Sequence, residues 1–283
     1  MQFVFNYLQS LSIMSKKKVL FISQEIVPYL TETPLGKIGR YLPQGIQERG
    51  KEIRTFMPRF GNINERRNQL HEVIRLSGMN LIINDNDHPL IIKVASIQSA
   101  RMQVYFIDNE EYFSRKSTIR AKDKSFYADN DERMIFFARG VLETVKKLGW
   151  PPDVVHCHGW IAALVPLYLR TAYGQNPLYR DTKIITSYYD DDFPETLSPE
   201  LYHKLALDTI APSDLIYYKE PGFVNIMKAS AHFSDGLVIG AEKINAEVKE
   251  FLSTTGKPIL EHQNEEVYVD AISAFYDQFS DKN

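Results

Sequence analysis

The chain has 283 residues, of which 44% are hydrophobic, 24% charged and 12% aromatic. This composition is typical of a globular protein with one or two domains, and it excludes a disordered, collagen-like or low-complexity chain. With 33 basic against 36 acidic residues the net charge is −3, which gives no reason to expect binding to nucleic acid or to an anionic membrane. The single cysteine, Cys157, excludes an internal disulfide and indicates a cytoplasmic location.

The first residues do not have the features of a targeting segment. Residues 1–13 are mildly apolar, but they lack a basic start and a small-residue cleavage site, and a basic run follows them at 16–18. No apolar run reaches the roughly 18 residues that a membrane-spanning helix needs. We expect residues 1–15 to be an N-terminal extension.

Strand and helix patterns alternate at the start of the remaining chain. Residues 18–23 are an almost wholly apolar run, which suits a buried parallel strand. Residues 38–49 carry apolar side chains at helical spacing and end at Gly50, and residues 53–57 are the next apolar run. This order of strand, helix and strand predicts a βαβ unit.

The middle of the chain has a different pattern. Residues 81–83, 90–96 and 102–107 have the composition of short strands separated by polar turns, which predicts a β-hairpin insertion. Residues 130–148 carry apolar side chains at helical spacing and are followed by Gly149. We therefore expect a long helix there.

The alternation of strands and helices then returns. We expect strands at 154–158, 183–186, 236–239 and 257–260. We expect helices at 161–173, 201–207, 225–233, 241–252 and 267–279. The whole pattern predicts one α/β domain over residues 16–255, a doubly wound Rossmann-like parallel sheet, with residues 256–283 packing back on it as a strand and a helix. In such sheets ligands bind at the carboxyl ends of the strands.

Four segments carry motifs that occur in this order in one known family. They are 18–60, with Glu-x-x-Pro and Met-Pro-Arg-Phe; 126–136, with Phe-Tyr-Ala-Asp-Asn; 152–169, with His-Cys-His-Gly-Trp; and 224–236, with Asn-Ile-Met-Lys-Ala and Ser-Asp-Gly. Together they resemble the glycogen/starch synthases, retaining glucosyltransferases of the GT-B fold. The resemblance covers about residues 18–250 and corresponds to the N-terminal domain of such an enzyme. It implies that the second domain, which supplies most donor-binding residues, is absent.

The loop after the first strand departs from that family. Where the family has a lysine that offers its charge to the sugar donor and glycines that approach the phosphates, this chain has Thr31, Glu32, Thr33 and Pro34. The cation is lost, an acid is gained, and the proline lacks a backbone N–H. We expect no donor phosphate site in this loop.

Two further family positions are changed. The family's His-Asp-Trp is His158, Gly159 and Trp160 here, so a carboxylate directed at the sugar is missing. The family's Thr-x-His-Asn carries Tyr188 in place of the histidine that contacts the glucosyl group. The three changed loops contain only vestigial site positions, and we assign no catalytic residue.

A ligand cleft can remain without catalysis, because aromatic rings stack on sugars and polar groups bond to their hydroxyls. The candidates near the expected strand ends are Glu25, His158, Trp160, Tyr189 and Lys228. The alternative is that these aromatic rings only pack in the core and at its rim.

Two clusters have the residue types of metal ligands. His156 and His158 share one face of a strand and Cys157 points to the other, so a zinc ion would need further ligands from elsewhere. The acidic run at 190–192 has the oxygen ligands that magnesium takes, but charge runs are usually solvated loops. We therefore expect no metal and no cofactor. We expect the histidines to bond to backbone and the acidic loop to face solvent.

The leading hypothesis is a degenerate synthase-type domain, a pseudoenzyme that binds an oligosaccharide or a protein partner. One alternative is a glucosyltransferase half that is active only with a separate C-terminal-domain partner. Another is a structural or regulatory subunit of a metabolic complex. We also expect that an oligomer can form through the surface that the second domain would cover.

Overall fold

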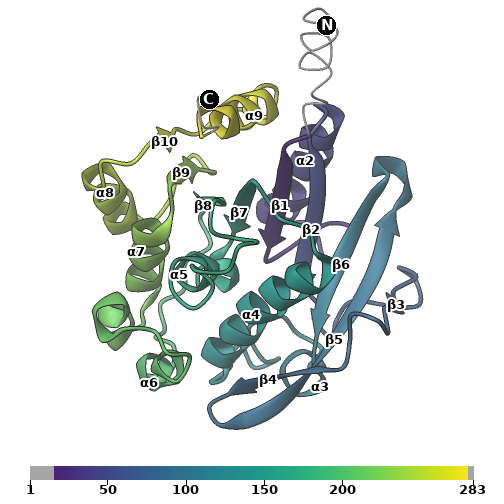
Figure 1. Ribbon diagram of the computed structural model, residues 1–283, viewed down its shortest axis with the longest axis vertical. Helices are drawn as coiled ribbons and strands as arrows, with labels where there is room; N and C mark the ends of the chain where they lie inside the picture. The colour runs from purple at the N-terminus through teal and green to yellow at the C-terminus, as the bar shows by residue number, and fades with distance from the viewer. Residues whose placement is uncertain (1–15, 280–283) are drawn as a thin grey trace, which may run out of the picture.

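The computed structural model describes residues 16–279, and its centre is a ten-stranded sheet (Figure 1). The strands are β1 (Lys18–Ser23), β2 (Glu52–Pro58), β3 (His71–Glu72), β4 (Met79–Ile83), β5 (Asn86–Ile97), β6 (Met102–Asp108), β7 (Val154–His158), β8 (Lys183–Tyr188), β9 (Gly236–Ile239) and β10 (Ile259–Leu260). Their order is β10-β9-β8-β7-β1-β2-β6-β5-β3, and β4 pairs with β5 outside this path. All pairs from β10 to β6 are parallel, which confirms the predicted Rossmann-like α/β fold. The expected extension at residues 1–15 lies outside the described residues.

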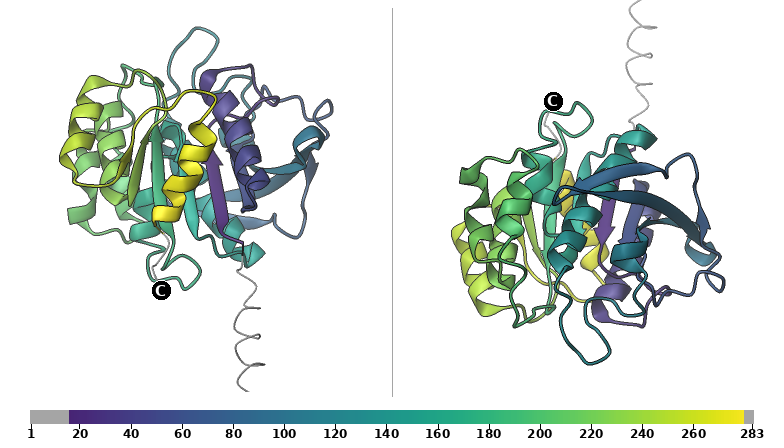
Figure 2. Two further views of the ribbon diagram at one scale, coloured as in Figure 1. Left: turned by 90° about the horizontal axis from the view of Figure 1, so that it is seen from above. Right: turned by 90° about the horizontal axis from the view of Figure 1, so that it is seen from below.

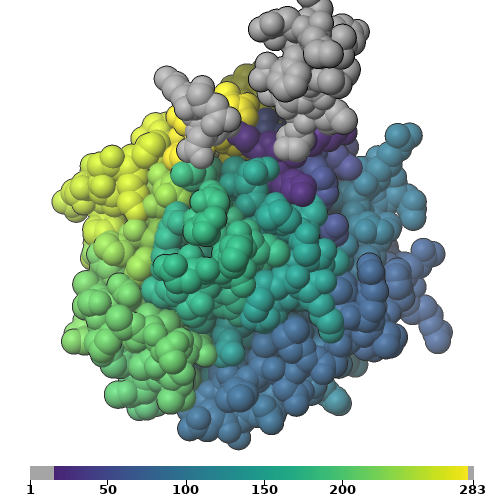
Figure 3. All heavy atoms as spheres, in the orientation of Figure 1, coloured from purple at the N-terminus to yellow at the C-terminus, as the bar shows by residue number. Residues whose placement is uncertain are grey.

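Helices cover both faces of this sheet. They are α2 (Pro34–Glu48), α3 (Glu110–Phe113), α4 (Asn130–Leu148), α5 (Val165–Arg170), α6 (Leu201–Ala206), α7 (Phe223–Phe233), α8 (Ala246–Thr254) and α9 (Tyr268–Gln278), with 3-10 turns η1 (Gln98–Ala100), η2 (Trp160–Ala162) and η3 (Pro212–Lys219). Helices α2 and α9 lie side by side on one face, and α4, α5 and α7 cover the other (Figure 2). In Figure 3 the teal segments, from α4 to β8, fill the middle of the second face. None of the helices in the described range is long and apolar enough to span a membrane.

The central strands are buried on both faces, which is why unbroken apolar runs predicted them. Val19, Leu20, Phe21 and Ile22 of β1 are all fully buried. The register sets Ser23 of β1 beside His158 of β7, and His158 beside Ser187 of β8. The three strands therefore end level. We call these strand ends, with the loops that follow them, the carboxyl edge.

Several helix boundaries differ from the prediction because side chains cap the helices. Helix α2 begins at Pro34 instead of residue 38, since Thr33 accepts a hydrogen bond from the Gly36 N–H. Helix α8 begins at Ala246 instead of residue 241, since the Asn245 side chain caps it. The helix predicted at 161–173 is wrong as a continuous element, because the chain forms η2 and then the short α5.

The hairpin insertion was only partly predicted. Strands β4 and β5 are joined at Asn84 and Asp85, which have φ values of 50° and 61°; two positive φ angles are what a tight type I′ hairpin turn requires. Strand β6, predicted as part of the insertion, pairs in parallel with β2 through Thr55 and Val104. This pairing makes β6 part of the main sheet. Its antiparallel pairing with β5 confirms the hairpin expected between these two strands.

Helix α9 buries its apolar stripe on the sheet. Ile272, Phe275 and Tyr276 are at most 5% exposed, and they pack in one cluster with side chains of β1, β7, β8 and β9. Two glycines make room for the helix: a Cβ on Gly45 of α2 would lie 2.6 Å from Val269, and one on Gly236 of β9 would lie 2.5 Å from Phe279. The close fit joins α9 to both α2 and the sheet.

The burial of this stripe predicts that α9 stabilises the whole domain. Truncation after Leu260 should lower the midpoint of urea unfolding and promote aggregation, because it exposes apolar sheet surface. Phe275→Ala alone should reduce the free energy of unfolding by about 3 kcal/mol or more. Gln278→Ala, on the exposed side of the same helix, is the matched control and should change it by less than about 0.5 kcal/mol. Equal midpoints for the Phe275 and Gln278 variants would contradict a stabilising role.

Candidate functional site

The carboxyl edge is held together by Gln24, the first residue after β1. Its backbone N–H donates to the carbonyl of His158 at 3.0 Å, and its side-chain Oε1 accepts from the Ile161 N–H at 3.2 Å. Gln24 is only 4% exposed. The loops after β1 and β7 are therefore joined by two hydrogen bonds that involve one buried residue. Sequence reasoning missed it, since no local pattern distinguishes Gln24 from a surface glutamine.

Gly159 cannot carry a side chain in this arrangement. Its φ is +81°, which favours glycine, and a Cβ would lie 2.8 Å from the Gln24 Cβ and 3.1 Å from Leu35. Cβ contacts under 3.0 Å are essentially never seen, so something would have to shift. The carboxylate that the resemblance implies at this position in the family is thus missing here, and Gln24 leaves no space for one.

The loop before α2 is bonded within itself. The Thr33 hydroxyl donates to the Glu25 carboxylate at 2.5 Å and accepts from the Gly36 N–H at 2.9 Å. Pro34 occupies the first turn of the helix, where a backbone N–H has no partner within the helix, so the proline removes no internal hydrogen bond. Thr31 and Glu32 are exposed, and Glu32 forms an ion pair with Lys37 at 2.9 Å.

Tyr188, the last residue of β8, and Tyr189, the next residue, have different side-chain partners. The Tyr188 hydroxyl lies 3.2 Å from the Ser230 hydroxyl of α7, and the residue is 1% exposed. It is a core side chain that does not reach the surface of the carboxyl edge. The Tyr189 hydroxyl lies 2.7 Å from His158 Nδ1, and its ring packs over Gly240. Burial raises the pKa of both phenols, so both stay neutral.

The two histidines of β7 bond to side chains, so the expectation that they bond to backbone is wrong. His156 lies 2.6 Å from the Tyr276 hydroxyl and 2.7 Å from the Ser187 hydroxyl, and His158 Nε2 is buried without a partner. Burial lowers the pKa of His158 to about 3 and that of His156 well below its ordinary value. Both rings are neutral, and Tyr276 links the site to α9.

The expected stacking faces are not free. Trp160 is 1% exposed, and its ring packs 4.8 Å from that of Phe193 and 5.8 Å from that of Phe126. Lys228 belongs to the contact between α7 and α8, where it pairs with Glu247 at 2.6 Å. Of the five cleft candidates, the structure gathers Glu25, His158, Trp160 and Tyr189 at the carboxyl edge and ties Lys228 to α8. Among the described residues, no three His, Cys, Asp or Glu side chains could hold a metal ion.

One member of the acidic run turns inward, which corrects the prediction of a uniformly solvated loop. Asp191 Oδ2 accepts from the Trp160 N–H at 3.2 Å, and Oδ1 is shielded without a hydrogen-bond partner. Burial, with a smaller contribution from the Glu25 charge, raises the pKa of Asp191 to about 7. Asp190 and Asp192 are exposed as expected. Nothing in three identical residues signals which one faces inward.

The raised pKa of Asp191 predicts a pH-dependent stability. The ordinary pKa of an aspartate is 3.8. Between that pH and about pH 7, the folded protein keeps a proton on Asp191 that the unfolded chain has released. The stabilisation is therefore complete below pH 4 and is lost as the pH rises through 7. Between pH 4.5 and 8 the wild type should lose about 2 kcal/mol or more of unfolding free energy relative to Asp191→Asn. Asp190→Asn should keep the wild-type profile. The free energies of unfolding are measured by urea unfolding at each pH. An equal change between pH 4.5 and 8 in all three proteins would refute a protonated Asp191 in the folded state.

Comparison with known proteins gives a consistent result. A family model described as the starch synthase catalytic domain matches residues 18–257. The glycogen synthase of Chlorobium limicola is 34% identical over 219 residues, which cover 77% of this chain and 44% of that protein. The glycogen synthase of Pelodictyon phaeoclathratiforme is 34% identical over 251 residues, which cover 87% of this chain and 50% of that protein. The chain spans about half the length of these curated relatives.

The fold has a solved counterpart. The catalytic domain of starch synthase IV from Arabidopsis thaliana, bound to ADP and acarbose, superposes with a TM-score of 0.70 at 17% identity, over 88% of this chain and 52% of that one. This similarity concerns the fold alone. The family model and the relatives at 34% identity show that the sequence is similar as well. The chain belongs to the starch synthase catalytic domain family, the family of the glycogen and starch synthases.

Proposed function

We propose that this domain does not transfer glucosyl units by itself and that it binds short α-glucans at the carboxyl edge. The observation that supports the absence of transfer is the exclusion of a side chain at Gly159 by Gln24. The family resemblance places a carboxylate there, and in this chain the packing of the edge leaves no room for one. Tyr188, at the position of the family's histidine, bonds to Ser230 in the core.

The charge of the edge supports a glucan ligand over a nucleotide-sugar donor. Glu25, Glu32 and the exposed Asp190 and Asp192 lie around it, and Lys37 is already paired with Glu32. A diphosphate would be repelled by this concentration of acid. Sugar hydroxyls are uncharged and donate hydrogen bonds to carboxylates. The half-buried Glu25, held by Thr33, is the carboxylate that we assign to this contact.

A second candidate is a glucosyltransferase half that requires residues from another polypeptide. The observation that favours it is length, since the chain spans about half of the glycogen synthases that it matches. A structural or regulatory subunit would keep the fold but need neither ligand. The three candidates differ in what the isolated protein binds and turns over.

The distinguishing experiment combines a transfer assay with calorimetry. We expect no transfer of glucose from ADP-glucose or UDP-glucose to glycogen above a heat-inactivated control. Maltoheptaose should bind, and Glu25→Ala should weaken its binding at least fivefold because a hydroxyl loses its acceptor. Glu32→Ala, an exposed acid in the same region, is the control and should bind like wild type. Turnover by the isolated protein, or the absence of glucan binding, would overturn the proposal.

The packing at Gly159 can be tested separately. Gly159→Asp should lower the free energy of unfolding by about 2–4 kcal/mol, because it adds a clash with Gln24 to the strain of a positive φ. Gly50→Asp is the control for a positive φ without a clash, since Gly50 has φ +84° with nothing within 4 Å of an added Cβ. It should cost about 1 kcal/mol, the strain alone. Gly159 also has ψ 156°, a conformation essentially limited to glycine, which adds to the cost of Gly159→Asp. Equal unfolding free energies for the two variants would show that Gln24 does not exclude a side chain. Neither variant should gain transferase activity.

A further inference from the structure

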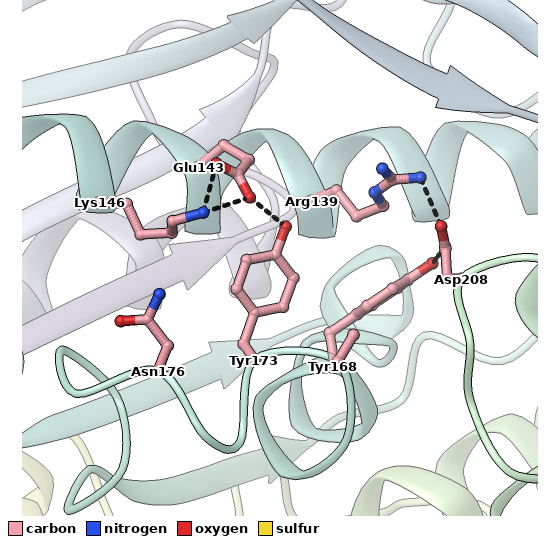
Figure 4. A pocket seen from close by; sticks show the side chains of 8 residues that line it. Arg139, Glu143, Lys146, Tyr168, Tyr173, Asn176 and Asp208 are labelled. Atoms are coloured by element: carbon pink, nitrogen blue, oxygen red, sulfur yellow. Dashed lines mark hydrogen bonds and ion pairs between the residues drawn. The ribbon is translucent and has the colours of Figure 1, made fainter.

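Two polar hollows lie away from the carboxyl edge, and their charges differ. The first lies between α4 and the segment after α5, and its charged groups are paired with one another (Figure 4). Arg139 bonds to Asp208, which also accepts from Tyr168; Lys146 bonds to Glu143, which also accepts from Tyr173. Because these charged groups are paired with one another, the hollow does not favour a charged ligand.

The second hollow, of about 390 Å³, contains no acid. It lies at the amino ends of β2 and β6, between α2 and η1, at the opposite end of the strands from the carboxyl edge. Its lining residues are Gln47, Ile53, Arg54, Ser96, Ile97, Gln98, Arg101, Met102, Gln103 and Tyr105. Two guanidinium groups therefore face a hollow without a carboxylate, in a protein whose net charge is −3. We call it the arginine hollow.

Arg54 is held rigidly in the arginine hollow. Its guanidinium lies 5.1 Å from the Trp150 ring centroid and 5.8 Å from that of Tyr105, and Nη1 donates to the Tyr105 hydroxyl at 2.7 Å. Its Nε is buried without a hydrogen-bond partner, and none of the ion pairs of the described residues includes Arg54 or Arg101. The Glu52 carboxylate accepts a hydrogen bond from the Trp150 indole N–H at 2.5 Å and does not line the hollow. Since Nε is shielded from solvent, the donor of Arg54 that is left for a ligand is Nη2, which bonds to none of the described residues. A guanidinium with such a donor is suited to an oxyanion.

At the end of α2 beside the hollow, three of the last four carbonyls are hydrogen-bonded. A helix C-terminus carries partial negative charge on its free carbonyls. Here the carbonyls of Gly45, Ile46 and Gln47 accept hydrogen bonds from Arg49, Lys51 and Gly50 respectively. The Gln47 side chain faces the hollow and adds an uncharged amide.

We propose that the arginine hollow binds a phosphorylated small polyol, such as a sugar phosphate. The phosphate oxygens bond to Arg54 and Arg101, which present planar donors of the geometry that phosphate accepts. The amides of Gln47, Gln98 and Gln103 offer both donors and acceptors to the hydroxyls of the ligand. The site is separate from the glucan contact at Glu25, so neither depends on the other.

The test uses the full chain with ribose 5-phosphate, inorganic phosphate and free ribose, measured by calorimetry at low salt. Ribose 5-phosphate should bind more tightly than inorganic phosphate, and free ribose should not bind. Affinity should rise from pH 5.5 to 7.5, as phosphate loses its second proton near pH 6 while arginine stays charged, and it should fall with added salt.

Variants locate the site and keep the test independent of the glucan proposal. Arg101→Gln, at an exposed turn residue, should weaken ribose 5-phosphate binding at least tenfold and leave maltoheptaose binding unchanged. Arg54→Gln should have the same effect. Arg75→Gln, an exposed arginine outside the hollow, is the control and should bind like wild type. The proposal is overturned if ribose 5-phosphate does not bind, if free ribose binds equally well, or if Arg101→Gln binds like wild type.

Discussion

The structure depends on the in-register parallel pairing of β2, β1, β7 and β8. This pairing buries both faces of β1, so each face needs a helical layer of its own. One layer comes from α4, α5 and α7, and the other from α2 and α9. The same register aligns Ser23, His158 and Ser187, so the loops that follow these strands meet at one edge. The core and the candidate site therefore have a common origin.

The second helical layer links the end of the described chain to that edge. Tyr276 of α9 lies 2.6 Å from His156, which lies 2.7 Å from Ser187 on the next strand. Both histidines are kept neutral by burial, which suits a structural network better than proton transfer at neutral pH. Beside them, Gln24 joins two loops and fills the space that a side chain at Gly159 would need. The edge is thus packed where the family resemblance leads one to expect catalytic groups.

Charge is distributed unevenly between the two ends of the strands. The carboxyl edge carries several acids, and Lys37 beside it is paired with Glu32. The amino end holds Arg54 and Arg101 in a hollow whose lining contains no acid. In a protein with a net charge of −3, this separation favours uncharged hydroxyls at one end and anions at the other. The two proposed ligands, an uncharged α-glucan and an anionic sugar phosphate, differ in the same way.

Local sequence was sufficient for the parallel strands, because a strand buried on both faces is an unbroken apolar run, as in Lys18–Ser23. It was sufficient for α4, whose apolar period ends at Gly149, and for the motifs that place the chain in its family. It was not sufficient for the site. Whether Tyr188 faces the core, which of three aspartates turns inward and what Gln24 excludes all depend on residues distant in sequence, such as Ser230 and Trp160. Apolar periodicity records burial, which each segment carries in its own residues, whereas the direction of a loop side chain is decided only when the strands and helices pack together.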